Sequence, residues 1–345
     1  ICSYCDFARV VKNEVLTGQW LKRITEEVER LPDLPVQTVY VGGGTPSCLS
    51  YDKQETLLRP LRRFGKAEEF TIEANPENVC DKLSVLWAEN GVNRVSLGVQ
   101  SFQSEILKTM NRRHDEKTIR QAIDSLRRAG ITNISIDLMY GVPKQTEENW
   151  MEDLQIAVSL PVTHISLYSL TIEPHSVWGR QQVEKPDEDL ECDLYEMAIA
   201  YLQQHGFEQY EVSNFARNGN VSVHNTGYWH YDDFYGVGMG ASGKENHCRY
   251  DNTRNLKQYL DGVKREATVL SHTDECFEAV MMGLRLKEGM NLADYYNRYG
   301  ENLYALYKPA IDKHIRLGNL LLTDTHLKTT SQGFFLLHEI LVDFL

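Results

Sequence analysis

The sequence is poor in several features that would assign it to other classes of protein. Its 345 residues contain no internal repeat, no low-complexity tract and no apolar run near the roughly 18 residues of a membrane span. Basic residues are in the minority, 36 against 49 acidic ones, and the net charge of −13 argues against a general nucleic-acid binder. No signal peptide is recognisable. We therefore expect a cytoplasmic protein with no nucleic-acid partner and no membrane span.

Cysteine is also scarce, and its distribution argues against a disulfide framework. The seven cysteines are odd in number and, after the first pair, scattered along the chain. They are Cys2, Cys5, Cys48, Cys80, Cys192, Cys248 and Cys276. Such a pattern is typical of a reducing compartment, and only the first pair has the spacing of a metal or redox motif.

That first pair, in Ile1-Cys2-Ser3-Tyr4-Cys5, is the most informative stretch of the sequence. A tight turn lets two thiolates at this spacing reach one soft metal centre. The motif alone leaves three options open: half of a zinc site, a thiol–disulfide pair, or part of an iron–sulfur ligand set. Zinc would need two further ligands, and no second C-x-x-C exists. The other two options stay open, since any further ligand upstream would lie before Ile1.

The pattern of apolar residues predicts an α/β fold. With 42% apolar residues, the chain can build a sizeable core. The expected strands are 36–41, 69–74, 94–100, 133–139, 164–172 and 208–213. The expected helices are 19–31, 53–64, 82–90, 116–129, 147–158 and 187–205. This alternation predicts a parallel sheet, and about six βα units favour a partial (β/α)6-type barrel over a closed eight-fold one. A doubly wound open sheet also fits the pattern.

The remainder of the chain has a different character. Residues 210–255 are rich in Asn, Gly, Tyr, His and Trp without a clear period, which predicts a long structured loop region. Helices are expected at 274–287, 291–299, 303–317 and from about Gly333, with a short strand at 320–323. We expect a barrel over 1–215, a loop-rich extension over 216–270 and a smaller, mostly helical C-terminal domain over 271–345, for which a winged helix is one option.

Polar residues gather where the predicted parallel strands end. In α/β folds these carboxyl ends carry the functional groups. The first strand is followed by Gly42-Gly43-Gly44-Thr45, whose missing side chains let a ligand approach the backbone. Glu73, Gln100, Asp137 and Thr171 stand at the ends of later strands. Each alone is as well explained by a cap or a surface position, but their common position predicts one ligand site.

Taken together, these motifs resemble the radical S-adenosylmethionine (SAM) family. Its members carry C-x3-C-x2-C, and Cys2 and Cys5 match the second and third cysteines. The resemblance implies a [4Fe–4S] cluster with one iron left open for SAM, whose reductive cleavage gives a 5′-deoxyadenosyl radical. It also implies that a glycine-rich segment, further strand-end residues and the Met110–His114 stretch contact SAM. The implied SAM-binding residues are Tyr4, Gly43, Gly44, Thr45, Glu73, Gln100, Arg112, Asp137 and Thr171.

Two features distinguish the branches of this family that the chain resembles. Oxygen-independent coproporphyrinogen III oxidases have a fourth cysteine two residues after the third, whereas this chain has Phe7. The heme-chaperone branch has an H-N-x-x-Y-W element linked to heme binding, which His224, Tyr228 and Trp229 match. An exposed imidazole beside two aromatic rings is a plausible axial ligand, although a lone histidine more often only supports a loop.

The resemblance therefore implies a heme chaperone that binds heme through His224 and transfers it to an acceptor protein, with possible peripheral contact to a membrane-bound acceptor. The alternative within the family is the decarboxylating oxidase. A third possibility is a binding protein in which cluster and SAM stabilise a heme-transfer state without turnover. A catalytic and a regulatory SAM site need the same ligands, so we assign no catalytic residue from the sequence.

Overall fold

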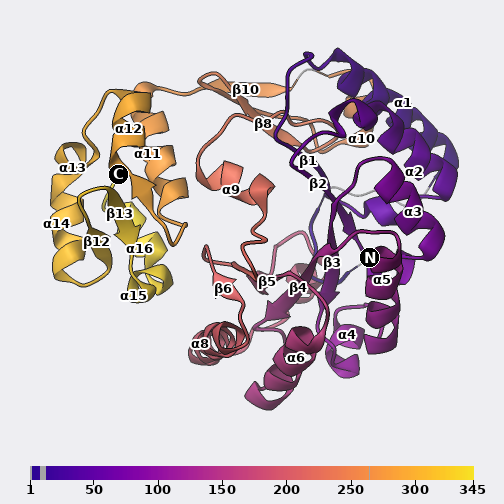
Figure 1. Cartoon of the computed structure of the whole chain (residues 1–345), viewed down its shortest axis with the longest axis horizontal. Helices are drawn as coiled ribbons and strands as arrows, with labels where there is room; N and C mark the ends of the chain where they lie inside the picture. The colour runs from indigo at the N-terminus through magenta and orange to yellow at the C-terminus, as the bar shows by residue number, and fades with distance from the viewer. Residues whose placement is uncertain (1, 8–12, 264) are drawn as a thin grey trace. The chain divides into compact units, whose positions relative to one another are not determined.

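The computed structural model describes residues 2–7, 13–263 and 265–345, so Ile1 at the start of the predicted cluster segment lies outside them. The chain forms two compact units, which are drawn in Figure 1. Unit 1 comprises Ile1–Glu208 and Ser213–Val221, and unit 2 comprises Gln209–Val212 and Ser222–Leu345. We describe each unit by itself.

Unit 1 is built on a seven-stranded sheet with the order β1-β2-β3-β4-β5-β7-β6. Its strands are β1 Thr38–Val41, β2 Glu69–Ala74, β3 Arg94–Gln100, β4 Asn133–Tyr140, β5 His164–Ser169, β6 Glu208–Gln209 and β7 Asn214–Ala216. Strands β1 to β5 pair in parallel, which confirms the predicted parallel sheet. The predicted strand 208–213 is wrong, because the chain reverses there and β7 pairs antiparallel with β5. The short connection between β6 and β7, residues 210–213, can join these neighbouring strands only if they run antiparallel.

Helices follow the strands of unit 1 as the pattern predicts. They are α1 Glu14–Arg30, α2 Tyr51–Leu58, α3 Asp81–Glu89, α4 Ser104–Thr109, α5 Glu116–Arg128, α6 Glu147–Ser159, α7 Val177–Gln181 and α8 Glu188–Gln204. The predicted helix 53–64 divides into α2 and a 3₁₀ turn, Arg59–Phe64, because Pro60 lacks the N–H that an α-helix would use. In contrast, α6 begins sharply at Thr146, whose hydroxyl accepts the N–H of Asn149 in a capping box.

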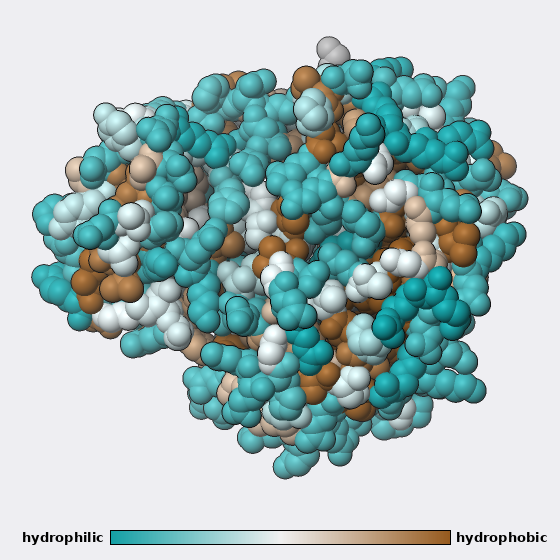
Figure 2. Space-filling view, viewed as in Figure 1, coloured by the Kyte–Doolittle hydropathy of each residue, from teal (hydrophilic) through white to brown (hydrophobic). Residues whose placement is uncertain are grey.

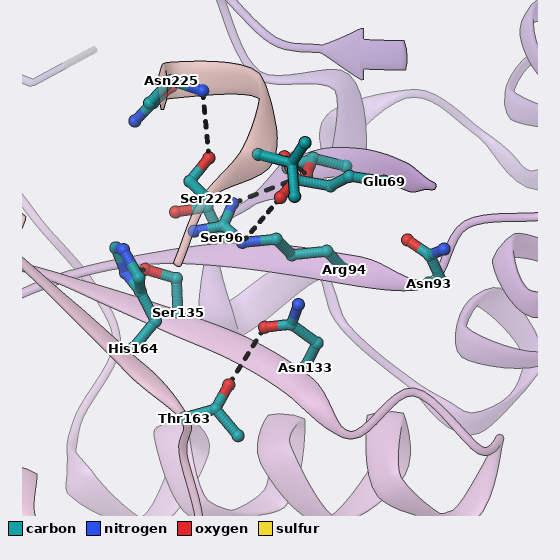
Figure 3. A network of polar contacts seen from close by, with 12 residues as sticks. Glu69, Asn93, Arg94, Ser96, Asn133, Ser135, Thr163, His164, Ser222 and Asn225 are labelled. Carbon is teal, nitrogen blue, oxygen red and sulfur yellow. Dashed lines mark hydrogen bonds and ion pairs between the residues drawn. The ribbon is translucent and has the colours of Figure 1, made fainter. Parts of the chain in front are cut away.

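The two faces of this sheet differ in polarity. Phe70, Val95 and Ile134 belong to the apolar face, which packs with Trp87, Trp150 and other helix residues in one buried core. The alternate positions on the same strands are polar, since successive side chains point to opposite faces. Figure 3 shows part of this polar face, including Glu69, Arg94, Ser96, Ser135 and His164, all of them buried. Ser135 Oγ lies 2.8 Å from His164 Nδ1. The polar face is therefore internally hydrogen-bonded.

Unit 2 begins with the region predicted to be a long loop, and that prediction is wrong in part. It contains α9 Val223–Trp229, α10 Leu256–Leu260 and an antiparallel sheet of β8 Ser242–Glu245, β9 Cys248–Asp251 and β10 Glu266–Val269. Strands β8 and β9 are joined through Asn246 and His247, both with φ of 47°. Two left-handed residues suit the twist of a tight hairpin, and Asn tolerates this conformation, so a turn signal was present.

The C-terminal part of unit 2 combines helices with a small sheet, as expected. The helices are α11 His272–Gly283, α12 Leu292–Tyr299, α13 Leu303–Leu306, α14 Lys308–Arg316, α15 Ser331–Phe335 and α16 Leu337–Val342. Strands β11 Met290–Asn291, β12 Leu320–Leu322 and β13 His326–Thr329 form an antiparallel sheet with β13 in the centre. The predicted helix 303–317 is divided into α13 and α14, and Pro309 lies in the first turn of α14, where its missing N–H is tolerated.

A second apolar core fills unit 2, with Val280, Ile311, Leu327 and Ile340 among its fully buried members. The molecular surface in Figure 2 is mainly hydrophilic, and apolar side chains show there in smaller patches. Among the described residues, no helix has the length and apolar character needed to cross a bilayer.

Candidate functional site

The cysteine loop is held in place by its backbone rather than by its thiols. Ser3 N–H donates to the Met110 carbonyl over 3.1 Å, and the Ser3 carbonyl accepts from the Trp178 N–H over 2.9 Å. Tyr4, between the two cysteines, packs its ring 6.0 Å from that of Trp178. Cys2 and Cys5 are free thiols of intermediate exposure. The loop therefore presents two thiols from a fixed backbone.

Arg112 connects this loop to the ends of two strands. Its Nη1 lies 3.3 Å from Cys2 Sγ and 3.1 Å from Asn75 Oδ1, and its Nη2 donates to the Gly98 carbonyl. Burial alone would lower the pKa of Arg112, but Tyr4 and Cys2 outweigh it and the pKa is raised. A side chain at Gly98 would place its Cβ 2.8 Å from the guanidinium. A permanent positive charge thus lies beside the Cys2 thiol.

Glu73, at the end of β2, is bound to the glycine-rich loop that follows β1. Tyr40 donates its hydroxyl to one carboxylate oxygen over 2.6 Å, and Gly43 N–H donates to the other over 3.0 Å. Burial raises the pKa of Glu73, although the Tyr40 hydrogen bond opposes that rise. A Cβ at Gly42 would stand 2.5 Å from the Tyr40 ring and 2.9 Å from the carboxylate. Glycine is therefore required at position 42 for this contact.

Asp137 lies on the same face of the sheet as Glu73. Ser96 is paired in register with Glu73, and its hydroxyl donates to Asp137 Oδ1 over 2.9 Å. Desolvation of its partly buried carboxylate raises the pKa of Asp137, while Ser96 and the charge of Arg94 act in the opposite direction. The Asp137 charge in turn raises the pKa of Glu73. Two carboxyl groups with raised pKa values in one place are typical of a functional site.

The structure brings most of the predicted residues of unit 1 together. Gln100 takes a φ of 68° where the register between β3 and β4 shifts. Its side chain and that of Arg112 both lie next to Gly98, where a Cβ would contact each of them. Thr45 is half-buried at the end of the glycine-rich loop, whereas Thr171 is exposed beyond the end of β5 and has no hydrogen bond to this group among the described residues.

Sequence reasoning missed Tyr40, Asn75 and Ser96, which hold Glu73, Arg112 and Asp137. A signal for two of them existed. Tyr40 stands two residues before the Gly42–Thr45 segment, and Ser96 stands four before Gln100, so strand alternation places both on the same face as predicted residues.

The H-N-x-x-Y-W element forms helix α9 in unit 2. His224 and Tyr228 lie four residues apart on one side of the helix, with Nε2 and the hydroxyl 2.8 Å apart. Tyr228 also packs edge-on against Phe234, and burial raises its pKa to about 12. The expectation of an exposed imidazole is wrong, because His224 is half-buried and held by Tyr228. Trp229 instead carries the Arg285 guanidinium 4.5 Å above its ring.

Comparisons with known proteins agree with this arrangement. Residues 1–157 match the model of the radical SAM superfamily, and residues 270–336 match that of the HemN C-terminal domain. The chain is 35% identical to the heme chaperone HemW of Lactococcus lactis, over 100% of this chain and 94% of that protein. The chain belongs to the HemW family of radical SAM proteins. HemW of Escherichia coli is 32% identical, again over 100% of this chain and 94% of the relative.

A solved structure outside the HemW family supports the fold. Coproporphyrinogen III oxidase HemN from Escherichia coli has a TM-score of 0.87, covering 100% of this chain and 87% of HemN. At 23% identity this likeness concerns the fold alone. Radical SAM proteins carry a [4Fe–4S] cluster and SAM, and both cofactors belong to this chain as a member of that superfamily.

The residues of unit 1 fit those cofactors chemically. Cys2 and Cys5 offer thiol ligands, and Arg112 donates toward one of them. The glycine-rich loop and Glu73 offer backbone and carboxylate groups of the kind that SAM's amino acid and ribose parts require. The assignment of individual residues to SAM stays a prediction.

Proposed function

We propose that this protein is a heme chaperone, which binds heme at α9 and passes it to an acceptor protein. The observation that carries the proposal is the His224–Tyr228 pair, held on one side of a helix, in a chain 35% identical over its whole length to a HemW protein. A neutral imidazole is a common iron ligand. His224 would supply Nε2 to the iron in exchange for the Tyr228 hydroxyl.

In unit 1, Cys2 and Cys5 would be ligands of the cluster, and Arg112 would place a positive charge beside Cys2. The glycine-rich loop, Glu73 and Asp137 would bind SAM. When bound, the cluster supplies the electron that cleaves SAM in this superfamily. The chain's own contribution is to fix the Cys2–Cys5 loop, to exclude water through the surrounding strands and to keep the Arg112 cation beside Cys2 Sγ. Free thiol ligands require reducing conditions, and we therefore propose a cytoplasmic location.

The competing function is oxygen-independent coproporphyrinogen oxidation, which the HemN-like fold alone leaves open. Phe7 supports the chaperone, because it stands 55% exposed where the oxidases have a fourth cysteine. The acceptor of the heme is a protein whose identity experiment must establish. If that acceptor lies in a membrane, the chaperone would need only peripheral contact with the membrane to reach it.

The test is a heme titration followed by the Soret band, with full-length, anaerobically reconstituted wild type and His224→Ala. We expect saturable binding that the variant loses or that shows an altered spectrum. A coproporphyrinogen III assay on the same sample should give no vinyl product. An identical titration and spectrum in His224→Ala would remove His224 as the ligand, and turnover would favour the oxidase.

A further inference from the structure

A small apolar cluster in unit 1 is separate from the main core, and the cysteine loop packs against it. Tyr4, between the two cysteines, is one of the partly buried residues at its surface. The members of the cluster lie at or beyond the carboxyl ends of β3, β4 and β5, the edge of the sheet that carries the candidate site. They are Ile106, Met110, Met139, Val142, Leu170 and Trp178.

Trp178, which is only 4% exposed, contacts the cysteine loop at two points. Its N–H donates to the Ser3 carbonyl over 2.9 Å, and its ring centroid lies 6.0 Å from that of Tyr4. The N–H of Ser3 donates in turn to the carbonyl of Met110, another member of the cluster. Both backbone groups of Ser3 and the side chain of the next residue are therefore held by this cluster. All these contacts are between protein groups and require no metal.

The turn that carries Trp178 is itself tightly built. The Ser176 hydroxyl accepts the N–H of Gly179 over 2.9 Å and donates to the Glu173 carbonyl over 2.7 Å. A Cβ at Gly179 would stand 2.1 Å from that carbonyl, so only glycine fits there. The Trp178 carbonyl accepts the N–H of Val183 over 3.1 Å. Trp178 is thus presented to the cysteine loop from a fixed backbone.

We propose that Trp178 is a positioning residue for the [4Fe–4S] cluster, which fixes the Cys2–Cys5 loop and keeps water from the side of the loop that carries Tyr4. The inference rests on the proposed role of Cys2 and Cys5 as cluster ligands. A loop that is ordered before the cluster binds loses less conformational entropy on binding, so the cluster is held more tightly. An apolar shell beside a metal site also limits access of solvent to it.

A residue that serves only packing would act differently. Its loss would loosen the cysteine loop only to the extent that it destabilises the whole of unit 1. A positioning residue changes the order of the loop and the retention of the cluster beyond any change in stability. Two replacements separate the contributions of Trp178, because Phe keeps an aromatic ring beside Tyr4, whereas Leu keeps apolar bulk without a ring.

The first measurement is amide hydrogen exchange at Ser3 in the metal-free protein, which reports the order of the loop without any cluster. The Ser3 N–H should be protected in wild type and in Trp178→Phe, because its hydrogen bond to Met110 persists. In Trp178→Leu, which lacks the ring contact to Tyr4, the same amide should exchange markedly faster.

The second measurement is the rate of iron release from the reconstituted protein to a ferrous chelator, without oxygen and without SAM. Trp178→Leu should release iron about ten-fold faster than wild type, the size typical of losing an outer-shell contact, and Trp178→Phe should stay close to wild type. Phe207→Leu is the matched control, since it replaces a fully buried aromatic residue of the main core. Urea unfolding should show a loss of stability in this control, while its iron release stays at the wild-type rate.

Rapid exchange of the Ser3 amide in wild type, or equally fast iron release from Trp178→Leu and Phe207→Leu, would refute the positioning role. The ligand role of the cysteines would still stand if Cys5→Ser abolishes the cluster, and it would fail if Cys5→Ser retains it. Should Trp178→Leu not fold, Tyr4→Leu removes the same ring contact from the side of the loop. Tyr4→Leu must then release iron faster than wild type, and a wild-type rate would refute the inference.

Discussion

At the scale of single residues, the Tyr228 hydroxyl is hydrogen-bonded to the His224 nitrogen that we propose as the iron ligand. Its hydroxyl lies 2.8 Å from His224 Nε2, and with a pKa of about 12 it stays protonated at neutral pH. Coordination must break this hydrogen bond, whose net worth is roughly 0.5–1.5 kcal/mol. The hydroxyl therefore competes with the iron.

We expect Tyr228→Phe to raise heme affinity by about two- to ten-fold, since the ring still packs on Phe234 but the hydroxyl that competes with the iron for Nε2 is gone. A Soret titration measures the change, and Tyr235→Phe, at a more exposed tyrosine of the same unit, serves as control. A weaker affinity in Tyr228→Phe would show instead that the hydroxyl orients the imidazole for binding.

Two neighbouring glycines give a second, internally controlled prediction. A methyl group at Gly42 would overlap Tyr40 and Glu73, whereas at Gly44 it would meet nothing within 4 Å. Gly42→Ala should therefore cost about 1–3 kcal/mol of folding free energy and weaken SAM binding, since the Glu73 contact to Gly43 is disturbed. Gly44→Ala should leave stability near that of wild type.

Urea unfolding measures the stability of both variants, and equilibrium binding of SAM to the anaerobically reconstituted protein measures the site. Equal stability of the two variants would mean that the glycine-rich loop moves away from Glu73 at little cost.

At the scale of elements, α6 controls the connection between β3 and α4 through one carboxylate. Asp153 accepts the Ser101 hydroxyl over 2.6 Å and the Phe102 N–H over 2.9 Å. Burial raises its pKa to about 6, and these hydrogen bonds only partly oppose that rise. The folded state therefore holds a proton on Asp153 at pH values where the unfolded chain, with a pKa of 3.8, has lost it.

Since the folded state binds more protons between these two values, the Asp153 contribution is complete below about pH 4 and is lost as pH rises through about 6. Two pKa units correspond to about 3 kcal/mol at most. Asp153→Asn, whose amide can accept from Phe102 and donate to Ser101, should remove this pH dependence. Urea unfolding between about pH 4.5 and pH 7.5 checks it, with Glu147→Gln on the same helix as control. Parallel curves for wild type and Asp153→Asn would contradict the assignment.

The elements also show how far the sequence could predict the fold. The parallel strands were readable because apolar residues alternate on strands whose helices cover one face, as Phe70 and Ile72 do in β2. The reversal of the chain after β6 could not be predicted, because residues 208–213 contain no turn signal as strong as Asn-Gly. The pairing of β7 with β5 is decided by tertiary contacts. Helix α9 was hidden because its seven residues are too few to display a period.

The same limits apply to the candidate site. Glu73 and Asp137 could be predicted because strand ends share one edge of a parallel sheet. Their supporting partners Tyr40 and Ser96 could have been found from alternation. The link between Arg112 and Cys2 could not, since it joins residues 110 positions apart through side-chain geometry that no local pattern encodes.

At the scale of the whole molecule, the two groups of functional residues belong to different compact units. Cys2 and Cys5 lie in unit 1, and His224 lies in unit 2. Each unit has its own buried core, so each can keep its structure when a ligand of the other is removed. We therefore expect the anaerobically reconstituted protein to lose its cluster in Cys5→Ser yet keep its His224-dependent heme spectrum.

The reciprocal variant, His224→Ala, should lose the heme spectrum and keep the iron and sulfide content and the cluster absorption of wild type. Iron and sulfide analysis together with Soret titrations, made on both variants and on the double variant, measure the two sites separately. Additive losses would show independent binding, because mutations at sites that share no partners combine additively. Loss of heme binding in Cys5→Ser would show instead that the cluster contributes to the heme site, and the third interpretation of the sequence, a cluster that stabilises a heme-transfer state, would then be favoured.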